Sequence, residues 1–450
     1  MMQNDIPTAD RELQRQNMQT ALARAREQMD ESQICLLLRK IGQLYLDESN
    51  APEALTCFEE ALKIAKKLQE KETESQLFGY KGFALKLLGN DDMALQAFQK
   101  AYGIAASLRR DGLMCDSLIQ IAIIESNVGR KHEAIEHHEQ AGKIARQMQD
   151  NPRKMRVASM LADNYYALED FQKAKENYTE AYEIASILGN RAAECSFLTK
   201  RGNISLREED LNSAISQYES ALILASDLED RSAEINILGG LFRANALKGD
   251  AGLATFYGER VIQLAHEIDY FEAEILNIQT LVTFLVEQKE YDKALSYLAR
   301  GKQLAEKKQQ EPEWLLTLLN TMAHTYYEAR QNEQALETFM QVLRLAGQYS
   351  EMEMEVKTLG HISTILTDEK RFEEAEQTIQ QALDIAGECQ DDELVGNLQI
   401  LRTLNYREQD EIQKAIVACE SAIQSYSAIE APQLATEANK LLSELRNLQP

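Results

Sequence analysis

The chain has 450 residues, with 73 acidic and 48 basic side chains and a formal net charge of −25 at neutral pH. A surface this acidic repels the phosphates of nucleic acids and anionic lipids, which makes both poor partners. Hydrophobic residues make up 44% of the chain, enough for a large core, and this argues against a disordered protein. Only 6 prolines and 20 glycines are present, too few for the linkers that would separate several domains.

The cysteines and the lengths of the apolar runs indicate in which cellular compartment the protein is expected. Six cysteines are spread along the chain without a C-x-x-C spacing, which is typical of buried thiols in a reducing environment. The longest apolar runs have five residues, as in 34–38, too short to span a bilayer or to form the core of a signal peptide. We therefore expect a cytoplasmic protein without membrane insertion.

An alanine recurs every 40 residues from Ala54 to Ala415, with a single interval of 41 residues between Ala294 and Ala335. A second residue, usually small, follows seven positions later and a third follows four positions beyond it. Spacings of seven and four place these residues on one stripe of a helix, and ten copies in register predict ten repeats. An aromatic residue often stands between the first two small residues, as do Phe58, Phe98, Tyr178, Tyr218 and Phe339.

The first half of each repeat carries its own small residue, twelve positions before the first alanine, for example Gly42 and Gly82. Each repeat is therefore predicted to contain a helix A, a short turn and a helix B. Glycines in the left-handed conformation commonly end helices. Such glycines stand where helix A should end at Gly89, Gly129 and Gly249.

The ends of the chain continue the pattern with single helices. Residues 10–29 match a helix B and residues 433–448 match a helix A, and both are polar on one face, as terminal caps of a repeat array must be. We therefore expect an N-terminal capping helix in residues 1–32, ten repeats of about 40 residues in 33–430 and a C-terminal capping helix in 431–450. Proline is tolerated in the first turn of a helix. Prolines occur in predicted first turns at Pro52, Pro152, Pro312 and Pro432.

The pattern A-x3-F-x2-A that begins at Ala54, following a small residue in helix A, resembles the tetratricopeptide repeat. The 40-residue period exceeds the usual length of about 34 and is similar to the long-helix subclass of kinesin light chains, the Leu-Gly-Asn-repeat polarity adaptor, MalT-type regulators and Rap-type peptide receptors. HEAT and armadillo arrays lack this alanine–aromatic–alanine register. The resemblance implies an all-α fold, a right-handed α–α superhelix (solenoid) of ten helix-turn-helix repeats with terminal capping helices. Its helices A would line a concave groove for a peptide or a partner helix.

The best-known binding motif of this family is a carboxylate clamp of lysine and asparagine side chains in neighbouring repeats. Asn203 matches one clamp position, but Gly240 stands at the matching position of the next repeat and the first lysine is absent. No partner can therefore be assigned by motif.

Three positions of helix A share a face and are expected to line the groove: three before, one after and four after its small residue. We call these positions the helix A face. They mix apolar, polar and cationic side chains, which suits a peptide or an amphipathic helix along repeats two to six. Alternatively, Phe83 and Ile123 pack against the next repeat. Glycines occupy the first of the three positions at Gly79, Gly239 and Gly360. The candidate partner-binding residues are Arg39, Gln43, Phe83, Lys86, Ile119, Ile123, Asp163, Tyr166, Asn203, Arg243, Asn320, His324 and Tyr327.

The histidines and the missing motifs argue against catalysis. His132, His137 and His138 are not spaced as the i, i+4 pair that would bind a metal from one helical face. His138 occupies the position of Phe58 in its repeat, which predicts a core side chain. The chain has no glycine-rich phosphate loop, no G-x-S-x-G and no H-E-x-x-H. We therefore expect no catalytic residue, no metal site and no cofactor.

The sequence thus predicts a non-catalytic scaffold or adaptor that binds a protein or peptide partner. A regulatory receptor for a small signalling peptide of the Rap type is an alternative, as is a structural solenoid that self-assembles into homo-oligomers. Rap-type receptors carry a further N-terminal module, whereas about thirty residues precede the first repeat here. This difference favours the adaptor.

Overall fold

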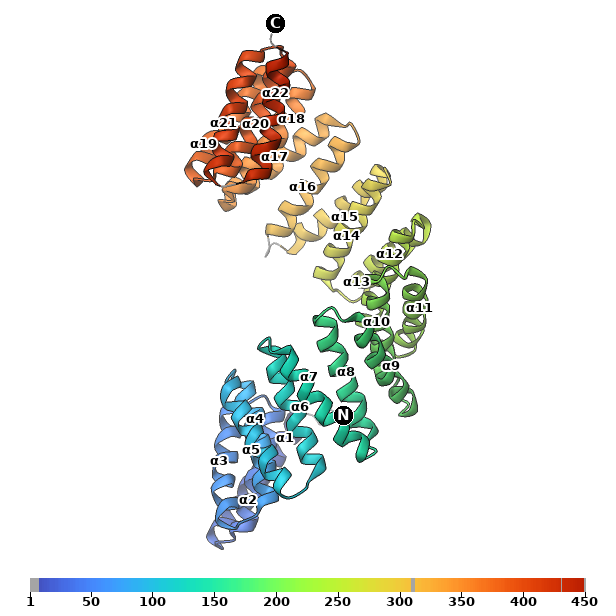
Figure 1. Ribbon diagram of the computed structural model, residues 1–450, viewed down its shortest axis with the longest axis vertical. Helices are drawn as coiled ribbons and strands as arrows, with labels where there is room; N and C mark the ends of the chain where they lie inside the picture. Colours follow the sequence, from blue (N-terminus) through green and yellow to red (C-terminus); the bar gives the residue numbers. More distant parts are fainter. Residues whose placement is uncertain (1–7, 309–311, 430, 449–450) are drawn as a thin grey trace. The chain divides into compact units, whose positions relative to one another are not determined.

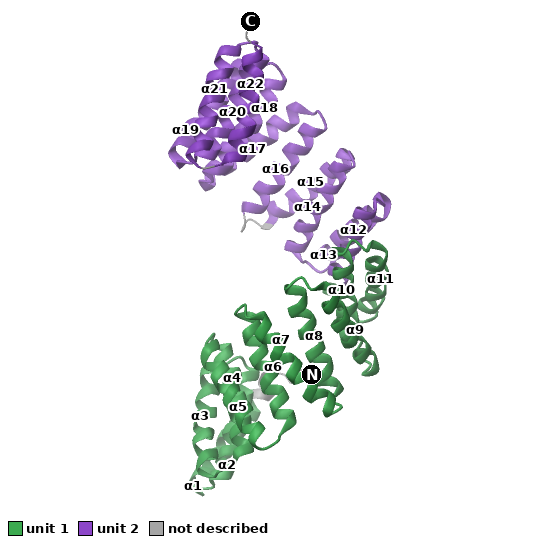
Figure 2. Cartoon of the chain, in the orientation of Figure 1, with its two compact units in different colours: residues 1–233 green, residues 234–450 purple. Residues whose placement is uncertain are grey.

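The computed structural model describes residues 8–308, 312–429 and 431–448. These residues form 22 α-helices and no β-strand (Figure 1), which confirms the predicted all-α repeat fold. The chain divides into two compact units, residues 1–233 and residues 234–450 (Figure 2). No helix in the described ranges is long and apolar enough to cross a lipid bilayer.

Helices of 16 to 20 residues follow one another in both units. Unit 1 contains α1 (Thr8–Glu27), α2 (Glu31–Asp47), α3 (Ala51–Lys67), α4 (Lys71–Leu87), α5 (Asp91–Ser107), α6 (Asp111–Asn127), α7 (Lys131–Gln147), α8 (Asn151–Ala167), α9 (Phe171–Ile187), α10 (Arg191–Arg207) and α11 (Leu211–Asp227). Unit 2 begins within α12 (Arg231–Lys248) and continues with α13 (Ala251–Glu267), α14 (Phe271–Glu287), α15 (Tyr291–Lys308), α16 (Pro312–Glu328), α17 (Asn332–Tyr349), α18 (Met352–Asp368), α19 (Phe372–Cys389), α20 (Asp392–Glu408), α21 (Ile412–Ala428) and α22 (Pro432–Asn447).

Even-numbered helices from α2 to α20 are the predicted helices A, and the helix after each is its helix B. The ten pairs match the ten predicted repeats, with α1 before the first pair and α22 after the last. That α1 and α22 cap the array, with domain boundaries near residues 32 and 430, stays a prediction. The four prolines lie in the first turn of a helix, as predicted.

The turns recur every 20 residues through unit 1, and each contains one residue with positive φ. The glycines predicted to end helices A adopt this conformation, with φ of 73° at Gly89, 85° at Gly129 and 82° at Gly249. The residue after each turn glycine donates its N–H to a carbonyl five residues earlier, as Asn90 does to Leu85 (2.9 Å). This bond satisfies a carbonyl that the helix end would otherwise leave unpaired.

In several repeats a small residue of helix A packs against a large side chain of helix B. The rings of Phe58, Phe98 and Tyr218 are almost completely buried in this way. A Cβ atom added to Gly82 would lie 2.7 Å from the Phe98 ring, and one added to Gly202 would lie 2.7 Å from Tyr218. These rings therefore occupy the space that the missing side chain leaves free.

In one repeat the large residue is on helix A and the small residue is on helix B. In the α12–α13 pair the large residue, Phe242, is on helix A, and Gly258 occupies the position of the large side chain on helix B. A Cβ at Gly258 would lie 3.2 Å from the Phe242 ring, which packs edge-on against Phe284 at 5.6 Å between centroids. The contact survives because the total volume of the pair stays similar.

His138 fills the large-residue position of the α6–α7 pair and is buried, which confirms its predicted place in the core. Its Nδ1 lies 3.3 Å from Nδ2 of Asn164, the amide that can donate to it. Burial, together with the charges of Arg156 and His137, lowers the pKa of His138 from its usual 6.5 to about 4. The imidazole is therefore neutral at pH 7.

We expect opposite stability changes from two alanine substitutions one turn apart in α4. Gly82→Ala should lower the free energy of unfolding by about 1–3 kcal/mol, because its methyl group would overlap the Phe98 ring. Gly79→Ala should raise that free energy by about 0.5–1 kcal/mol, since no atom lies within 4 Å of its Cβ position and alanine is the better helix former. Urea unfolding of the two variants measures both; equal effects would contradict the assigned packing.

The buried His138 should make stability depend on pH below neutrality. Because its folded pKa lies below the unfolded value of 6.5, the folded state resists protonation, and stability is lost as the pH falls from 6.5 towards 4. The expected slope is about 1.4 kcal/mol per pH unit for this one residue. His138→Phe should remove that share, so unfolding at several pH values should give a shallower profile than the parent protein. Parallel profiles would show that His138 titrates normally.

Candidate functional site

In unit 1 the predicted partner-binding residues lie where successive helices A meet. Arg39 Nη1 donates to Gln76 Oε1, and Gln43 Nε2 donates to the Tyr80 hydroxyl, each at 2.6 Å and each joining α2 to α4. The side chains remain partly exposed. They line a surface, and they also tie neighbouring repeats together.

The same arrangement continues along unit 1. Asp163 is exposed and accepts hydrogen bonds from the Tyr178 hydroxyl and from Lys200 Nζ, the latter at 2.6 Å. Asn203 accepts one from the Tyr218 hydroxyl at 2.7 Å. Two large core rings therefore present their hydroxyls to this surface. Tyr166 packs edge-on against Phe171 at 5.7 Å.

The apolar part of the prediction is wrong at Ile119, which is fully buried. The reason is that α6 packs against α5 and α7 and also contacts α4 and α8, which leaves this side of the helix without solvent. Ile119 belongs to a core cluster, and the half-buried Ile123 packs against the same cluster. Phe83 remains 39% exposed, with its ring edge-on to Phe98 at 5.3 Å.

A small hollow of about 140 Å³ opens between α4, α5 and α6, and we call it the unit-1 socket. Two residues of the predicted helix A face, Gly79 and Phe83, line it. Lys86 follows one turn later in α4; burial lowers the pKa of its amine, and the carboxylate of Asp91 opposes that shift. The other residues that line the socket are Ser75, Gln76, Tyr80, Phe98, Leu113, Asp116, Ser117 and Gln120.

In unit 2 the predicted residues are further apart. Arg243 is exposed on α12, and Asn320 is half-buried on α16. The Tyr327 hydroxyl donates to Asp368 Oδ2 at 2.6 Å, which joins α16 to α18, and this bond raises the pKa of Tyr327 to about 12. His324 is half-buried, and burial lowers its pKa.

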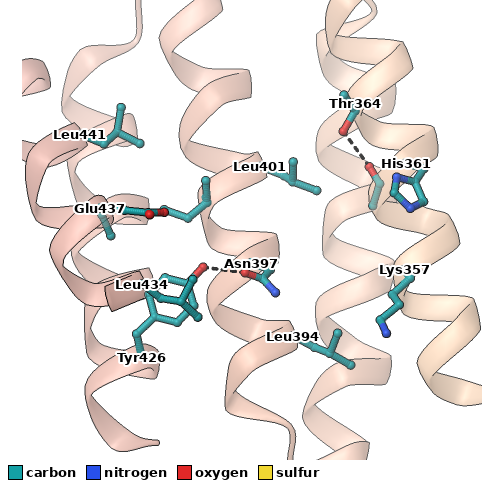
Figure 3. A pocket seen from close by; sticks show the side chains of 13 residues that line it. Lys357, His361, Thr364, Leu394, Asn397, Leu401, Tyr426, Leu434, Glu437 and Leu441 are labelled. Carbon is teal, nitrogen blue, oxygen red and sulfur yellow. Dashed lines mark hydrogen bonds between the residues drawn. The ribbon is translucent and has the colours of Figure 1, made fainter. Parts of the chain in front are cut away.

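A larger hollow of about 500 Å³, the unit-2 cleft, runs across one face of the three successive even-numbered helices α18, α20 and α22 (Figure 3). Gly360, at a helix A face position, forms part of its wall, and a Cβ there would lie 3.2 Å from Leu401. The cleft is lined by Lys357, Gly360, His361, Thr364, Leu394, Asn397, Ile400, Leu401, Tyr426, Leu434, Glu437, Ala438 and Leu441.

The cleft has an apolar floor and polar groups on either side. Lys357 and Glu437 lie on opposite sides in Figure 3. Lys357 pairs with Glu353, whereas Glu437 makes no ion pair within the described residues. Asn397 Oδ1 accepts a hydrogen bond from the Tyr426 hydroxyl at 2.8 Å, which leaves the amide N–H groups of Asn397 available to a ligand.

Two titratable side chains of the cleft, Tyr426 and His361, are neutral at pH 7. Burial raises the pKa of Tyr426 to about 12, and the carboxylates of Glu393 and Glu437 add to that shift. Burial lowers the pKa of His361 to about 4, helped by the charges of His324 and Lys357. The His361 ring stacks on Phe339 at 5.5 Å and meets the His324 ring edge-on at 4.3 Å.

The sequence prediction missed the cleft because it was confined to helices up to α18. The residues of α20 and α22 were open to the same reading, since Ile400 stands three positions before the small residue Thr403 of its helix. Leu401 and Asn397 lie two and six positions before Thr403, outside the three positions of the helix A face. No group of three or more histidine, cysteine, aspartate or glutamate side chains in the described part of the chain is arranged to hold a metal ion.

Comparison with known families is consistent with this geometry. A family model described as tetratricopeptide repeat matches residues 32–107 and 113–186, and a second model with the same description matches residues 316–349 and 356–389. Residues 32–107, 113–186, 316–349 and 356–389 therefore carry tetratricopeptide repeats, which confirms the predicted resemblance in parts of both units.

Two curated proteins resemble parts of it. The 43 kDa receptor-associated protein of the synapse from Tetronarce californica is 29% identical over 172 residues, 37% of this chain and 40% of that protein. The SH3 domain and tetratricopeptide repeat-containing protein 2 of Homo sapiens is 26% identical over 180 residues, 38% of this chain. The chain thus spans 40% and 14% of the lengths of these relatives.

Solved structures with similar folds include the apo form of RapI, with 15% identity and a TM-score of 0.49 over 74% of this chain and 98% of that one. A putative kinesin light chain with nearly identical TPR-like repeats from Podosopora anserina has 16% identity and a TM-score of 0.38 over 46% of this chain and 98% of that one. The family assignment rests on the two family models.

Tyr426→Phe should lower the free energy of unfolding by about 0.5–1.5 kcal/mol, the usual net contribution of one hydrogen bond. The ring would keep its packing, because a Cβ at Gly396 would lie 2.5 Å from it and the small residue leaves the ring its space. Only the bond to Asn397 is lost. Thermal unfolding measures the change, and an unaltered melting temperature would show that the bond contributes nothing in solution.

Proposed function

We propose that this tetratricopeptide-repeat protein is a non-catalytic interaction scaffold or adaptor that binds a segment of another protein on its helices A. The observation that carries the proposal is the unit-2 cleft, where three even-numbered helices in succession present one hollow. Its floor exposes apolar groups, and covering them with a ligand contributes favourably to the free energy of binding. A fully buried leucine-sized side chain contributes about 1.5–3 kcal/mol.

The dimensions suit a short peptide or one face of a helix. Three helices packed side by side at the usual axis separation of about 8–10 Å span about 20 Å, which sets the scale of a cleft across α18, α20 and α22. That length matches about six residues of extended chain, or about 13 residues of helix. Lys357 and Glu437 on opposite sides favour a segment that is apolar in the middle and carries charges of opposite sign on its flanks.

The same groups argue for binding and against catalysis. His361 is neutral, Lys357 is ion-paired with Glu353, and the Tyr426 hydroxyl is bonded to Asn397. None of these pairs joins a nucleophile to a base that could activate it, as covalent catalysis requires. We include in the proposal a cytoplasmic location, which the free thiols of all six cysteines support.

The net charge of −25 supports a protein or peptide partner over nucleic acid. The prediction that a partner also lies along repeats two to six remains part of the proposal. It is supported by the exposed Phe83 and the exposed Asp163. A second copy of this chain is the competing occupant of the cleft. The experiment below distinguishes it from a different partner protein.

Substitutions in the cleft should remove the partners that crosslinking pull-down and mass spectrometry recover. Leu401→Glu places a charge on the apolar floor, and Asn397→Arg fills the cleft from an exposed position. Each should reduce the recovery of specific partners at least tenfold, which corresponds to a loss of about 1.4 kcal/mol. Met340→Glu is the matched control, because Met340 is 49% exposed on α17 and does not line the cleft.

The control should recover the same partners as the parent protein, and all three variants should keep its helical circular dichroism. Unchanged recovery by both cleft variants would reject the cleft as the binding site. Light scattering on the same samples tests self-assembly. An oligomer that Asn397→Arg dissociates would identify a second copy of the chain as the occupant.

A further inference from the structure

The unit-1 socket contains one buried polar side chain that the protein leaves without a partner. Gln120 of α6 lines the socket and is 4% exposed, yet its amide makes no hydrogen bond with any other described residue. The nitrogen and oxygen of this amide are not among the fully enclosed side-chain atoms without a partner, so they remain accessible from the socket. A group bound in the socket can therefore pair with them.

Each of the other polar side chains of the socket has at least one hydrogen-bond partner in the protein. Arg39 donates to Gln76, Arg153 donates twice to Asp116 at 2.8 Å, and Gln43 donates to the Tyr80 hydroxyl. The hydroxyls of Ser75 and Ser117 donate to backbone carbonyls at 2.8 Å. Among these polar side chains Gln120 is the one without a hydrogen bond to another described residue, while the Gln76 amide nitrogen and the Tyr80 hydroxyl keep donors that face no acceptor among the described residues.

The remaining walls are aromatic and held in place. Phe83 and Phe98 meet edge-on at 5.3 Å between centroids, and Tyr80 stacks on Phe58 at 5.4 Å. Aromatic walls favour a further ring, which can pack edge-to-face or offset against them. The hollow of about 140 Å³ is roughly ten times the volume that a single water requires.

Gly79 keeps this hollow open. It lies in the middle of α4, where glycine is unfavourable for a helix, and no atom lies within 4 Å of the position that a Cβ would take. Packing therefore does not require a glycine there, in contrast to Gly82, whose place is filled by Phe98. A side chain at position 79 would project into space that the socket lining leaves empty.

We propose that the unit-1 socket binds the side chain of a tyrosine from a partner protein, with the ring between the aromatic walls and the hydroxyl on Gln120. A phenolic hydroxyl both donates and accepts, so it pairs with either end of the amide. This site goes beyond the scaffold function proposed above. It uses none of the residues of the unit-2 cleft, so either proposal can fail alone.

The test uses the full chain and two capped tripeptides, acetyl-Gly-Tyr-Gly-amide and acetyl-Gly-Phe-Gly-amide, followed by ligand-observed NMR titration. The tyrosine peptide should bind at millimolar concentration and at least tenfold more tightly than the phenylalanine peptide, because only the hydroxyl satisfies Gln120. Gln120→Leu should bring the two affinities together.

Gly79→Leu should abolish binding of both peptides by filling the socket. Gly103→Leu is its matched control, because Gly103 is an exposed glycine within α5 that also has no atom near its Cβ position, and binding should persist. The proposal is overturned if the tyrosine peptide does not bind the parent protein, or if both peptides bind equally. It is also overturned if Gln120→Leu keeps the preference for tyrosine or if Gly79→Leu leaves binding intact.

Discussion

The contact between a small residue on helix A and a large side chain on helix B is the constraint on which the rest of the structure depends. It brings the two helices of a repeat close together, and where the large residue is a tyrosine its hydroxyl also reaches the surface. Tyr178 and Tyr218 are buried at their rings and bonded at their hydroxyls to Asp163 and Asn203. Packing inside a repeat and the chemistry of its outer surface are therefore set by the same side chains.

Glycines at two different positions of helix A have different consequences. Gly82 is required by close packing, whereas Gly79 and Gly360, three positions before the small residue of their helices, border a socket and a cleft. The two candidate sites thus arise at the same place in the repeat, one in each unit, where a helix gives up a side chain and some of its intrinsic stability.

The repeat period was enough to predict the helices, the pairing of small and large residues and the core position of His138, because each depends on spacing alone. The solvent exposure of individual side chains was harder to predict from the sequence. Ile119 occupies a helix A face position yet is buried, since α6 has neighbours on every side that its sequence pattern does not reveal. The importance of Gln120 could not be predicted either. Whether an amide finds a partner depends on the lengths and orientations of side chains from three helices, and no single segment contains that information.

The left-handed residue at each turn has a consequence for how such a chain can vary. In unit 1 only three of these positions are glycine, and the others include Glu169, Glu209 and Arg109. Backbone hydrogen bonds at the helix end hold the conformation, so the identity of the side chain there is only weakly constrained. The tips of the repeats are consequently sites at which charge can be altered by substitution without repacking the interior, which lets related arrays diverge in surface potential while they keep one architecture.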